Sequence, residues 1–201
     1  MTETTDPPVA PRAPGRPRSE RAEKAILDAT LELLAAESGV DGVSIEAVAA
    51  LAGVAKTTIY RRWPNKEALI VGALAEAKAP LPEPRGESVR DDLLAIAEAI
   101  AAGRNARHSR CFWNVLGSHE KYPGLYERYY QQVIQPRRET VFSVLRAGIA
   151  RGELRPDIDL EVVNGLLVGP FHVPRPGAPL PDGYARKVVE TVLRAIGTER
   201  S

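Results

Sequence analysis

The sequence has one cysteine, one methionine and few aromatic residues, and it has no long run of apolar residues. Because Cys111 is alone, an intramolecular disulfide is excluded. No continuous apolar stretch reaches the roughly 20 residues that a membrane-spanning helix needs. Residues 1–17 are rich in proline and threonine and have no apolar run, which excludes a signal peptide and predicts a disordered tail. These absences make the cytoplasm the expected compartment and exclude a membrane partner.

Motifs for catalysis, phosphate binding and metal binding are absent as well. The chain has no glycine-rich phosphate loop, no nucleophile elbow and no paired carboxylates on a suitable scaffold. His119 and Glu120 match the start of a His-Glu-x-x-His zinc motif, but Pro123 stands in place of the second histidine. His108 and Cys111 are more simply explained as surface and packing residues. We therefore predict a protein that is not an enzyme and holds no metal and no cofactor.

Basic residues are concentrated in one short part of a chain whose net charge is only +1. Residues 47–66 contain no acidic residue. The four basic residues in this range are Lys56, Arg61, Arg62 and Lys66. A local positive surface suits a polyanion such as DNA, although a cluster of charges alone is more often a solvated helix face. The pattern around the cations favours DNA.

That pattern begins with a short amphipathic helix. Apolar residues recur at helical spacing over 45–52, and the hydroxyl of Ser44 can cap the first turn. Gly53 can end the helix because glycine adopts a positive φ without a steric penalty. The sequence therefore predicts a helix followed by a sharp turn.

A second helix is predicted over 56–63. Ile59 and Trp63, four residues apart, can face the core, which leaves the polar and basic side chains outside. Arginine can bond a guanine edge, threonine offers a hydroxyl and a methyl to bases, and lysine and tyrosine suit phosphate oxygens. Two short helices around a glycine turn, with the cations on the second, are the layout of a helix-turn-helix DNA reader.

Tyr60, Trp63 and Lys66 follow in order and precede an apolar helix over 68–77. From about residue 18 to residue 78, this arrangement resembles the DNA-binding domain of the TetR (tetracycline repressor) family. The resemblance implies that Tyr60 and Lys66 contact phosphates and that Trp63 belongs to the core. The predicted DNA-binding residues are Ser44, Lys56, Thr57, Thr58, Tyr60, Arg61, Arg62 and Lys66. Arginines before residue 19 either form a basic arm on DNA or belong to a solvated tail, and we favour the tail.

The rest of the chain has helical periodicity and no strand pattern, which predicts an all-α protein of about nine helices. After the tail at 1–17, an N-terminal three-helix DNA-binding domain with the helix-turn-helix is expected at 18–78. A proline-rich break at 79–86 opens a C-terminal helical effector-binding and dimerisation domain at 79–201. Its helices are predicted from a cap at Ser88, then at about 107–118, 123–151 with a bend at Pro136, 159–168 and 183–196.

The last two predicted helices have more apolar surface than one neighbour can cover. They form either an internal hairpin or a homodimer interface, and we favour the dimer. The predicted interface residues are Leu160, Val163, Leu166, Leu167, Val188, Val189, Val192, Leu193 and Ile196. A two-fold dimer presents its readers about 34–36 Å apart, which predicts an inverted repeat in the operator. The TetR resemblance also implies a dimer, and the segment 151–157 resembles one subgroup of TetR-like C-terminal domains.

Aromatic residues, scarce overall, gather on two segments of the second domain. The predicted effector-pocket residues are Cys111, Phe112, Trp113, His119, Tyr126, Tyr129 and Tyr130. The three tyrosines share one helix face, and such a stripe is more often core packing than a ligand site. Tyrosines with an available hydroxyl also suit a small, flat, mostly apolar organic effector.

We therefore predict a sequence-specific DNA-binding transcriptional regulator. It is expected to be a dimeric repressor that a small-molecule effector releases from double-stranded operator DNA. A helical small-molecule-binding enzyme or sensor without DNA binding is the alternative, since a helix pair can have the shape of a reader without reading DNA. An activator role is also open, because the sign of regulation depends on where the operator lies.

Overall fold

The computed structural model describes residues 16–104, 106–172 and 178–198. These residues form helices and turns, with one isolated bridge between Leu154 and Gly197. The predicted all-α fold is thus confirmed. The predicted disordered tail lies almost entirely outside the described residues, as does Arg12 of the possible basic arm, and only the backbone is described for Arg16 and Arg18.

Five helices make up the N-terminal part of the chain: α1 (Arg16–Ala35), α2 (Gly39–Gly42), α3 (Ile45–Ala52), α4 (Lys56–Tyr60) and α5 (Lys66–Ala77). The helix α1 begins at Arg16, two residues before the expected start of the DNA-binding domain at residue 18. Proline is tolerated in the first turn of a helix, so Pro17 does not delay the start. The Ser19 hydroxyl accepts a hydrogen bond from Arg62.

Caps and a glycine turn bound the helices here, and those at Ser44 and Gly53 agree with the prediction. Ser44 Oγ accepts a hydrogen bond from the Ala47 N–H at 3.1 Å and caps α3. Gly53 ends α3 with φ 65° and ψ 36°, the left-handed conformation that suits glycine. Asn65 Oδ1 accepts from the Ala68 N–H at 2.9 Å and caps α5.

The C-terminal part has α6 (Val89–Ala102), α7 (Ala106–Gly117), α8 (Pro123–Tyr129), a π-helical segment (Tyr130–Ile134), α9 (Gln135–Ala150), α10 (Leu160–Val168), a 3-10 turn (Gly169–Phe171) and α11 (Tyr184–Ile196). The described residues thus form eleven α-helices rather than about nine. The short α2 was not predicted, and the helix expected over 123–151 is divided. Pro136 has no N–H to donate, and the π-helical segment directly before α9 adjusts the hydrogen bonding at this point.

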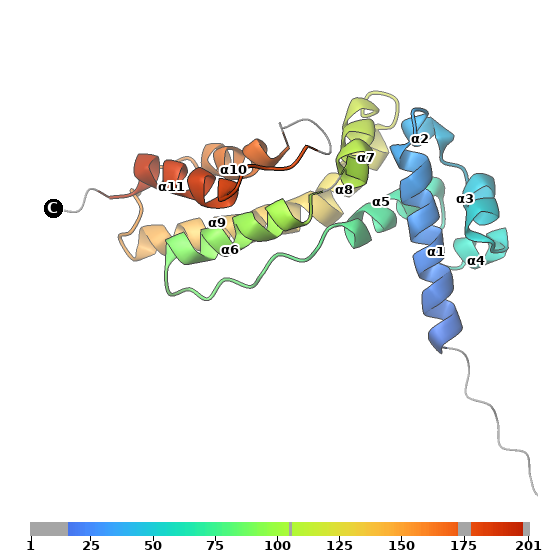
Figure 1. Ribbon diagram of the computed structural model, residues 1–201, viewed down its shortest axis with the longest axis horizontal. Coiled ribbons are helices and arrows are strands. Elements are labelled where there is room, and N and C mark those ends of the chain that lie inside the picture. The colour runs from blue at the N-terminus through green and yellow to red at the C-terminus, as the bar shows by residue number, and fades with distance from the viewer. Residues whose placement is uncertain (1–15, 105, 173–177, 199–201) are drawn as a thin grey trace, which may run out of the picture.

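Two hydrophobic cores hold the helices together. The first core joins α1, α3 and α5 to Cys111, Val115, Leu125, Tyr129 and Val133 from α7, α8 and the π-helical segment. The second core lies among α6, α9, α10 and α11. Figure 1 shows these groups as two arms, with α7 and α8 beside α1 and α5. Helices that follow the proline-rich connection at 79–86 thus contribute side chains to the core beneath the N-terminal helices.

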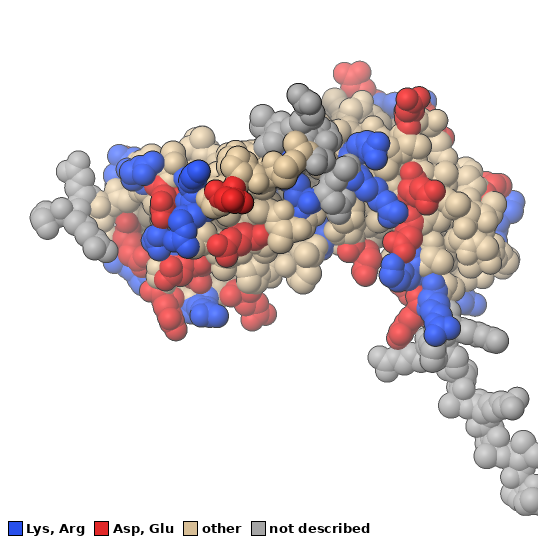
Figure 2. Space-filling view, viewed as in Figure 1, with Lys and Arg blue, Asp and Glu red and all other residues tan. Residues whose placement is uncertain are grey.

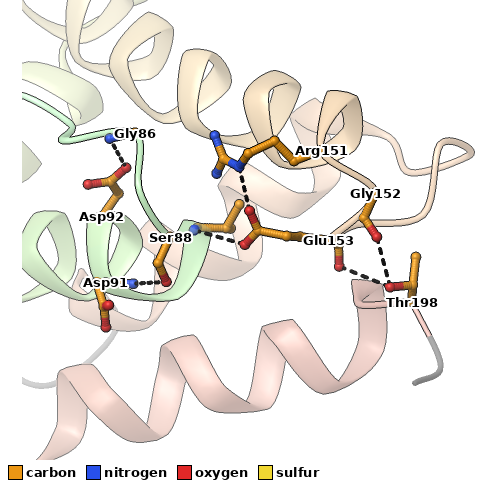
Figure 3. A network of polar contacts seen from close by, with 9 residues as sticks. Gly86, Ser88, Asp91, Asp92, Arg151, Gly152, Glu153 and Thr198 are labelled. Atoms are coloured by element: carbon orange, nitrogen blue, oxygen red, sulfur yellow. Dashed lines mark hydrogen bonds and ion pairs between the residues drawn. The ribbon is translucent and has the colours of Figure 1, made fainter. Parts of the chain in front are cut away.

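The connection into α6 is held by side-chain oxygens at the far end of the second arm (Figure 3). The Asp92 carboxylate accepts hydrogen bonds from the N–H groups of Arg85 at 2.8 Å and Gly86 at 2.9 Å. Ser88 Oγ accepts from the Asp91 N–H and caps α6, as predicted. The proline-rich connection is thereby fixed to the helix that follows it.

The segment 151–157 continues this network between α9 and α11. The Glu153 carboxylate accepts from the Val89 N–H at 3.1 Å and from the Arg151 guanidinium, as Figure 3 shows. Thr198 Oγ1, just after α11, donates to the Gly152 carbonyl at 3.0 Å. Glu153 thus ties the end of α9 to the start of α6, and Thr198 ties the chain after α11 to the same turn.

We predict that Gly72→Ala destabilises the protein although alanine is the better helix former. A Cβ at Gly72 would lie 2.6 Å from Trp63 Nε1, so the indole must move. We expect the free energy of unfolding to fall by about 1–3 kcal/mol in urea denaturation. Gly124→Ala is the control, because its Cβ meets Glu67 only at an ordinary 3.5 Å. Equal stability of the two variants would contradict the close packing of Trp63 on α5.

Candidate nucleic-acid interface and internal cavity

The reader consists of α3, the Gly53 turn and α4. Ile59 of α4 is fully buried and Trp63 packs against the first core, as their spacing predicted. The helix α4 ends at Tyr60, earlier than the predicted residue 63. On its other side, Thr57 and Tyr60 are exposed, as is Arg61 directly after it, with Tyr60 52% accessible. A short helix with one buried and one exposed side thus presents a guanidinium, a phenol and a hydroxyl together.

Lys56 is exposed beside them, but its charge has a partner. Its Nζ lies 2.9 Å from Glu46 Oε1, and both side chains are more than half accessible. The hydrogen bond to Glu46 raises the pKa of Lys56. A phosphate has to compete with this carboxylate, although exposed ion pairs are weak and exchange readily.

Arg62, another of the predicted DNA-binding residues, makes contacts within the protein. Its guanidinium turns toward α1 and donates to the Ser19 hydroxyl and carbonyl. Glu23 Oε2 lies 3.2 Å away, and the Arg62 side chain is only 21% accessible. Arg62 therefore joins α4 to α1, because α1 starts early enough to bring a hydroxyl and a carboxylate beside the reader.

Lys66, which was predicted to contact a phosphate, also has a partner within the protein. Its Nζ donates to the Val40 carbonyl at 2.8 Å and lies 5.1 Å from the centre of the Tyr122 ring. Partial burial lowers its pKa. Ser44 and Thr58 are half-buried, and the Ser44 hydroxyl already caps α3. The predicted DNA contacts most available on the surface are thus Lys56, Thr57, Tyr60 and Arg61.

The overall charge distribution does not single out this surface. On the face drawn in Figure 2, basic and acidic side chains are interspersed over both arms of the molecule. This agrees with the net charge of +1. The reader is therefore distinguished by which side chains α4 exposes, and not by a large field of one sign.

A cavity of about 470 Å³ lies where the two cores meet, a size in the range of small-molecule sites. Its walls come from the end of α5, the end of α6, α7, the segment from α8 to α9, α10 and the 3-10 turn. Five of the predicted pocket residues line it: Phe112, Trp113, Tyr126, Tyr129 and Tyr130. The cavity thus contains the aromatic residues that the sequence brings together on two segments.

Two predicted pocket residues lie elsewhere. Cys111 is buried in the first core, where its thiol points to the Leu31 carbonyl at 3.4 Å, because α7 turns this side toward α1. Burial raises its pKa to about 11, which makes the thiol unreactive at neutral pH. His119 is exposed after α7, and its Nδ1 lies 3.2 Å from the Leu116 carbonyl. In the described part of the chain no three His, Cys, Asp or Glu side chains are grouped to hold a metal ion.

The sequence analysis did not predict the basic and histidine side chains that line the cavity. They are Lys78, Arg104, Arg137, Arg138, His108 and His172. These residues come from five separate parts of the chain, and no periodic pattern connects them. The only local signal was a pair of arginines directly after Pro136, within a predicted helix.

Lys78 and Arg137 are the most affected by burial. Burial, together with the nearby charge of Arg137, lowers the pKa of Lys78 to about 8. Burial also lowers the pKa of Arg137, which donates to the Ala79 carbonyl at 2.7 Å. Two cations held together away from water cost stability unless an anion joins them.

Most of the predicted dimer residues are covered by the chain itself. Val163, Leu167, Val188, Val189, Val192 and Ile196 are buried in the second core, and Leu160 and Leu193 are half-buried. The reason is that α10 and α11 pack against α6 and α9 as well as each other. The exposed apolar side chains of this region are Leu166, at 51%, and Val162, at 58%, one turn apart on α10. None of the described helices is long and apolar enough to cross a membrane.

We predict that Lys78→Met stabilises the protein in a pH-dependent way. The ordinary pKa of lysine is 10.5, so the folded state binds fewer protons than the unfolded state between about pH 8 and 10.5. Wild-type stability therefore rises over this window relative to the variant. The advantage of Lys78→Met should be larger at pH 7 than at pH 10 by on the order of 2 kcal/mol, measured by urea denaturation.

The control for this measurement is Lys24→Met, which changes an exposed lysine on α1. Its stability difference from wild type should be nearly the same at both pH values. A Lys78→Met difference that is independent of pH would contradict the burial of the ammonium group.

The comparisons with known proteins agree with this geometry. The family model "Bacterial regulatory proteins, tetR family" matches residues 26–73, and the model "Tetracyclin repressor-like, C-terminal domain" matches residues 83–192. The chain is 35% identical over 185 residues to the uncharacterized HTH-type transcriptional regulator YdeS of Bacillus subtilis (strain 168), covering 90% of this chain and 93% of YdeS. It is 28% identical over 179 residues to the DNA-binding transcriptional repressor TetR of Mycobacteroides abscessus, covering 88% of this chain and 94% of that protein.

Among solved structures, the TetR family transcription regulator SCO0332 aligns with a TM-score of 0.60 and 28% sequence identity. The alignment covers 89% of this chain and all of that chain. The similarity therefore extends through both arms of the molecule. The chain belongs to the TetR family of helix-turn-helix transcriptional regulators, which are DNA-binding proteins and not enzymes.

Proposed function

We propose that the protein is a dimeric repressor that binds an inverted-repeat operator and leaves it when a small organic effector enters the cavity. The observation that carries the proposal is the exposed side of α4, where Thr57, Tyr60 and Arg61 stand opposite the buried Ile59. A helix of this kind enters the major groove with its exposed side toward base edges. Its function as a regulator of transcription places the protein in the cytoplasm with the DNA.

The exposed residues divide between bases and phosphates by their chemistry. Arg61 suits the O6 and N7 acceptors of guanine, and Thr57 suits a thymine methyl or a base acceptor. Tyr60 and Lys56 suit phosphate oxygens, with Lys56 exchanging Glu46 for a phosphate. Arg62 and Lys66 support the reader from within through their contacts with α1 and α2.

The dimer interface is proposed to centre on Val162 and Leu166 of α10. These two side chains lie one turn apart and are among the few large apolar side chains that remain exposed in the described chain. Gly165, between them, is exposed and would meet nothing if it had a Cβ, so a partner helix can approach closely here. The six buried residues that we had predicted at the interface would instead support α10 and α11 from behind.

The effector is proposed to act through α5. Leu74, Ala77 and Lys78, at the end of this helix and directly after it, line the cavity, and the helix begins directly after the reader. A bound molecule thus contacts the helix that carries the DNA-binding unit. Occupancy can then favour a separation of the two readers that does not fit DNA, a coupling that works equally in both directions.

We predict that Arg61→Ala weakens operator binding by about 1–3 kcal/mol, roughly 10- to 100-fold. Selection from a random duplex pool supplies the operator, and fluorescence anisotropy measures the affinity. Because Arg61 is exposed, the melting temperature should hardly change. The selected duplexes should contain an inverted repeat.

The matched control is Arg146→Ala, which removes an exposed arginine of α9 in the other arm and should leave operator affinity unchanged. If no duplex is selected, or if both variants bind as wild type does, the proposed reading surface is wrong.

We predict that Leu166→Glu shifts the protein from dimer to monomer in analytical ultracentrifugation. A carboxylate at the centre of an apolar interface has no partner and costs several kcal/mol. Leu51→Glu makes the same change at the other strongly exposed leucine, on α3, and should leave the dimer intact. A dimer that tolerates Leu166→Glu would exclude this face as the interface.

A further inference from the structure

The charged side chains that line the cavity are all of positive sign. Among its described lining residues are four basic side chains and two histidines, and no aspartate or glutamate. The rest of the lining is mostly aliphatic and aromatic. A cavity of this composition is unfavourable for a cation and favourable for an anion with an apolar body.

Only part of this positive charge is neutralised within the protein. Arg138 forms an ion pair with Glu161 and lies over the rings of Tyr130 and Phe142. In the described part of the chain, Lys78 and Arg137 have no carboxylate within ion-pair distance: Arg137 donates to a backbone carbonyl, and Lys78 lies 5.9 Å from the centre of the Phe112 ring. The available charge is thus concentrated on Lys78 and Arg137.

Two buried polar groups that lack a hydrogen-bond partner line the same cavity. The Tyr129 hydroxyl and the Asn164 side-chain oxygen have no partner in the described structure, and their residues are only 1% and 5% accessible. Buried polar atoms are nearly always paired, and an unpaired one costs about 1–3 kcal/mol. The Tyr129 O–H can donate to an acidic oxygen, and Asn164 Oδ1 can accept from a ligand donor.

The aromatic groups surround the same place. The Phe112 ring lies 5.1 Å from the His172 ring and 6.5 Å from the Tyr129 ring, centre to centre. Burial lowers the pKa of His172, and the nearby Lys78, Arg104 and Arg137 contribute, which favours the neutral imidazole. A flat ring system therefore has aromatic neighbours close to the unneutralised cations.

We propose that the effector is an organic anion: an aromatic or otherwise flat apolar body with one acidic group, which Lys78 and Arg137 bind and to which Tyr129 donates a hydrogen bond. The regulatory role of this ligand rests on the proposed function. The preference for an anion rests on the residues that line the cavity. Lys78, at the C-terminal end of α5, is then the residue through which the ligand charge reaches the DNA-binding unit.

The test compares two dyes that differ by one sulfonate group. Anilinonaphthalene sulfonate is a flat anion, and phenylnaphthylamine is the same molecule without the sulfonate. Both become fluorescent in apolar sites, so the full-length protein can be titrated with each. We expect the anion to bind with a Kd at least about tenfold lower, at one site per chain, and the neutral dye to displace it competitively.

Substitutions then identify the residues that cause the preference for the anionic dye. Lys78→Met and Arg137→Met should each reduce anion affinity about tenfold while the affinity for the neutral dye changes little. Arg110→Met, which removes an exposed arginine of α7 outside the lining, should leave both affinities unchanged. Should a charge-removing variant fail to fold, Tyr129→Phe still tests the hydroxyl, and it should weaken the anion more than the neutral dye.

Equal or tighter binding of the neutral dye overturns the inference, as does an anion preference that survives Lys78→Met and Arg137→Met. The operator titration distinguishes this failure from that of the proposed function. Protein that binds its operator but prefers the neutral dye remains a regulator with a different class of effector. Protein that binds no duplex but prefers the anion retains the charged site and loses the regulatory role.

Discussion

The packing of α7 and α8 onto α1 and α5 is the contact on which the rest of the structure depends. A unit of about 60 residues buries too small a share of its surface to be more than marginally stable. Cys111, Leu125 and Tyr129 enlarge the core beneath the reader, although they come from the C-terminal part of the chain. The reader is therefore held by the same helices that form one wall of the cavity.

The lysine and arginine side chains of this structure have three different kinds of surroundings. Arg61 and its neighbours on α4 remain exposed and available to DNA. Arg62 and Lys66 donate to hydroxyl and carbonyl oxygens of α1 and α2, which joins the chain after α4 and the start of α5 to those helices. Lys78 and Arg137 are half-buried beside the cavity, and desolvation lowers the pKa of both. Basic side chains thus lie on the exposed surface of the reader, in the contacts between helices and in the lining of the cavity.

The helix α5 extends from just after the reader to the cavity, and this gives a physical basis for communication between them. The first turn of α5 is capped by Asn65 directly after the reader, and its last residues line the cavity. Trp63 packs on Gly72 in the middle of the helix, so α5 cannot shift without the end of the reader. Lys78, directly after α5, thus lies at the cavity end of a helix whose other end adjoins the reader.

Local chemistry in the sequence determined the fold class, the caps at Ser44, Asn65 and Ser88, the turn at Gly53 and the identity of the reader, because these depend on residues within one or two turns of each other. It also identified the aromatic residues of the cavity, since they lie on two consecutive segments. Only the tertiary structure decided which helices and side chains contact one another. An amphipathic stripe shows that a helix face is covered and not what covers it, so α10 and α11 turned out to pack on α6 and α9. For the same reason the sequence could not show that Arg62 and Lys66 point inward, or that Lys78, Arg137 and Asn164 meet around one cavity. Those contacts depend on how distant helices are arranged, which no local pattern encodes.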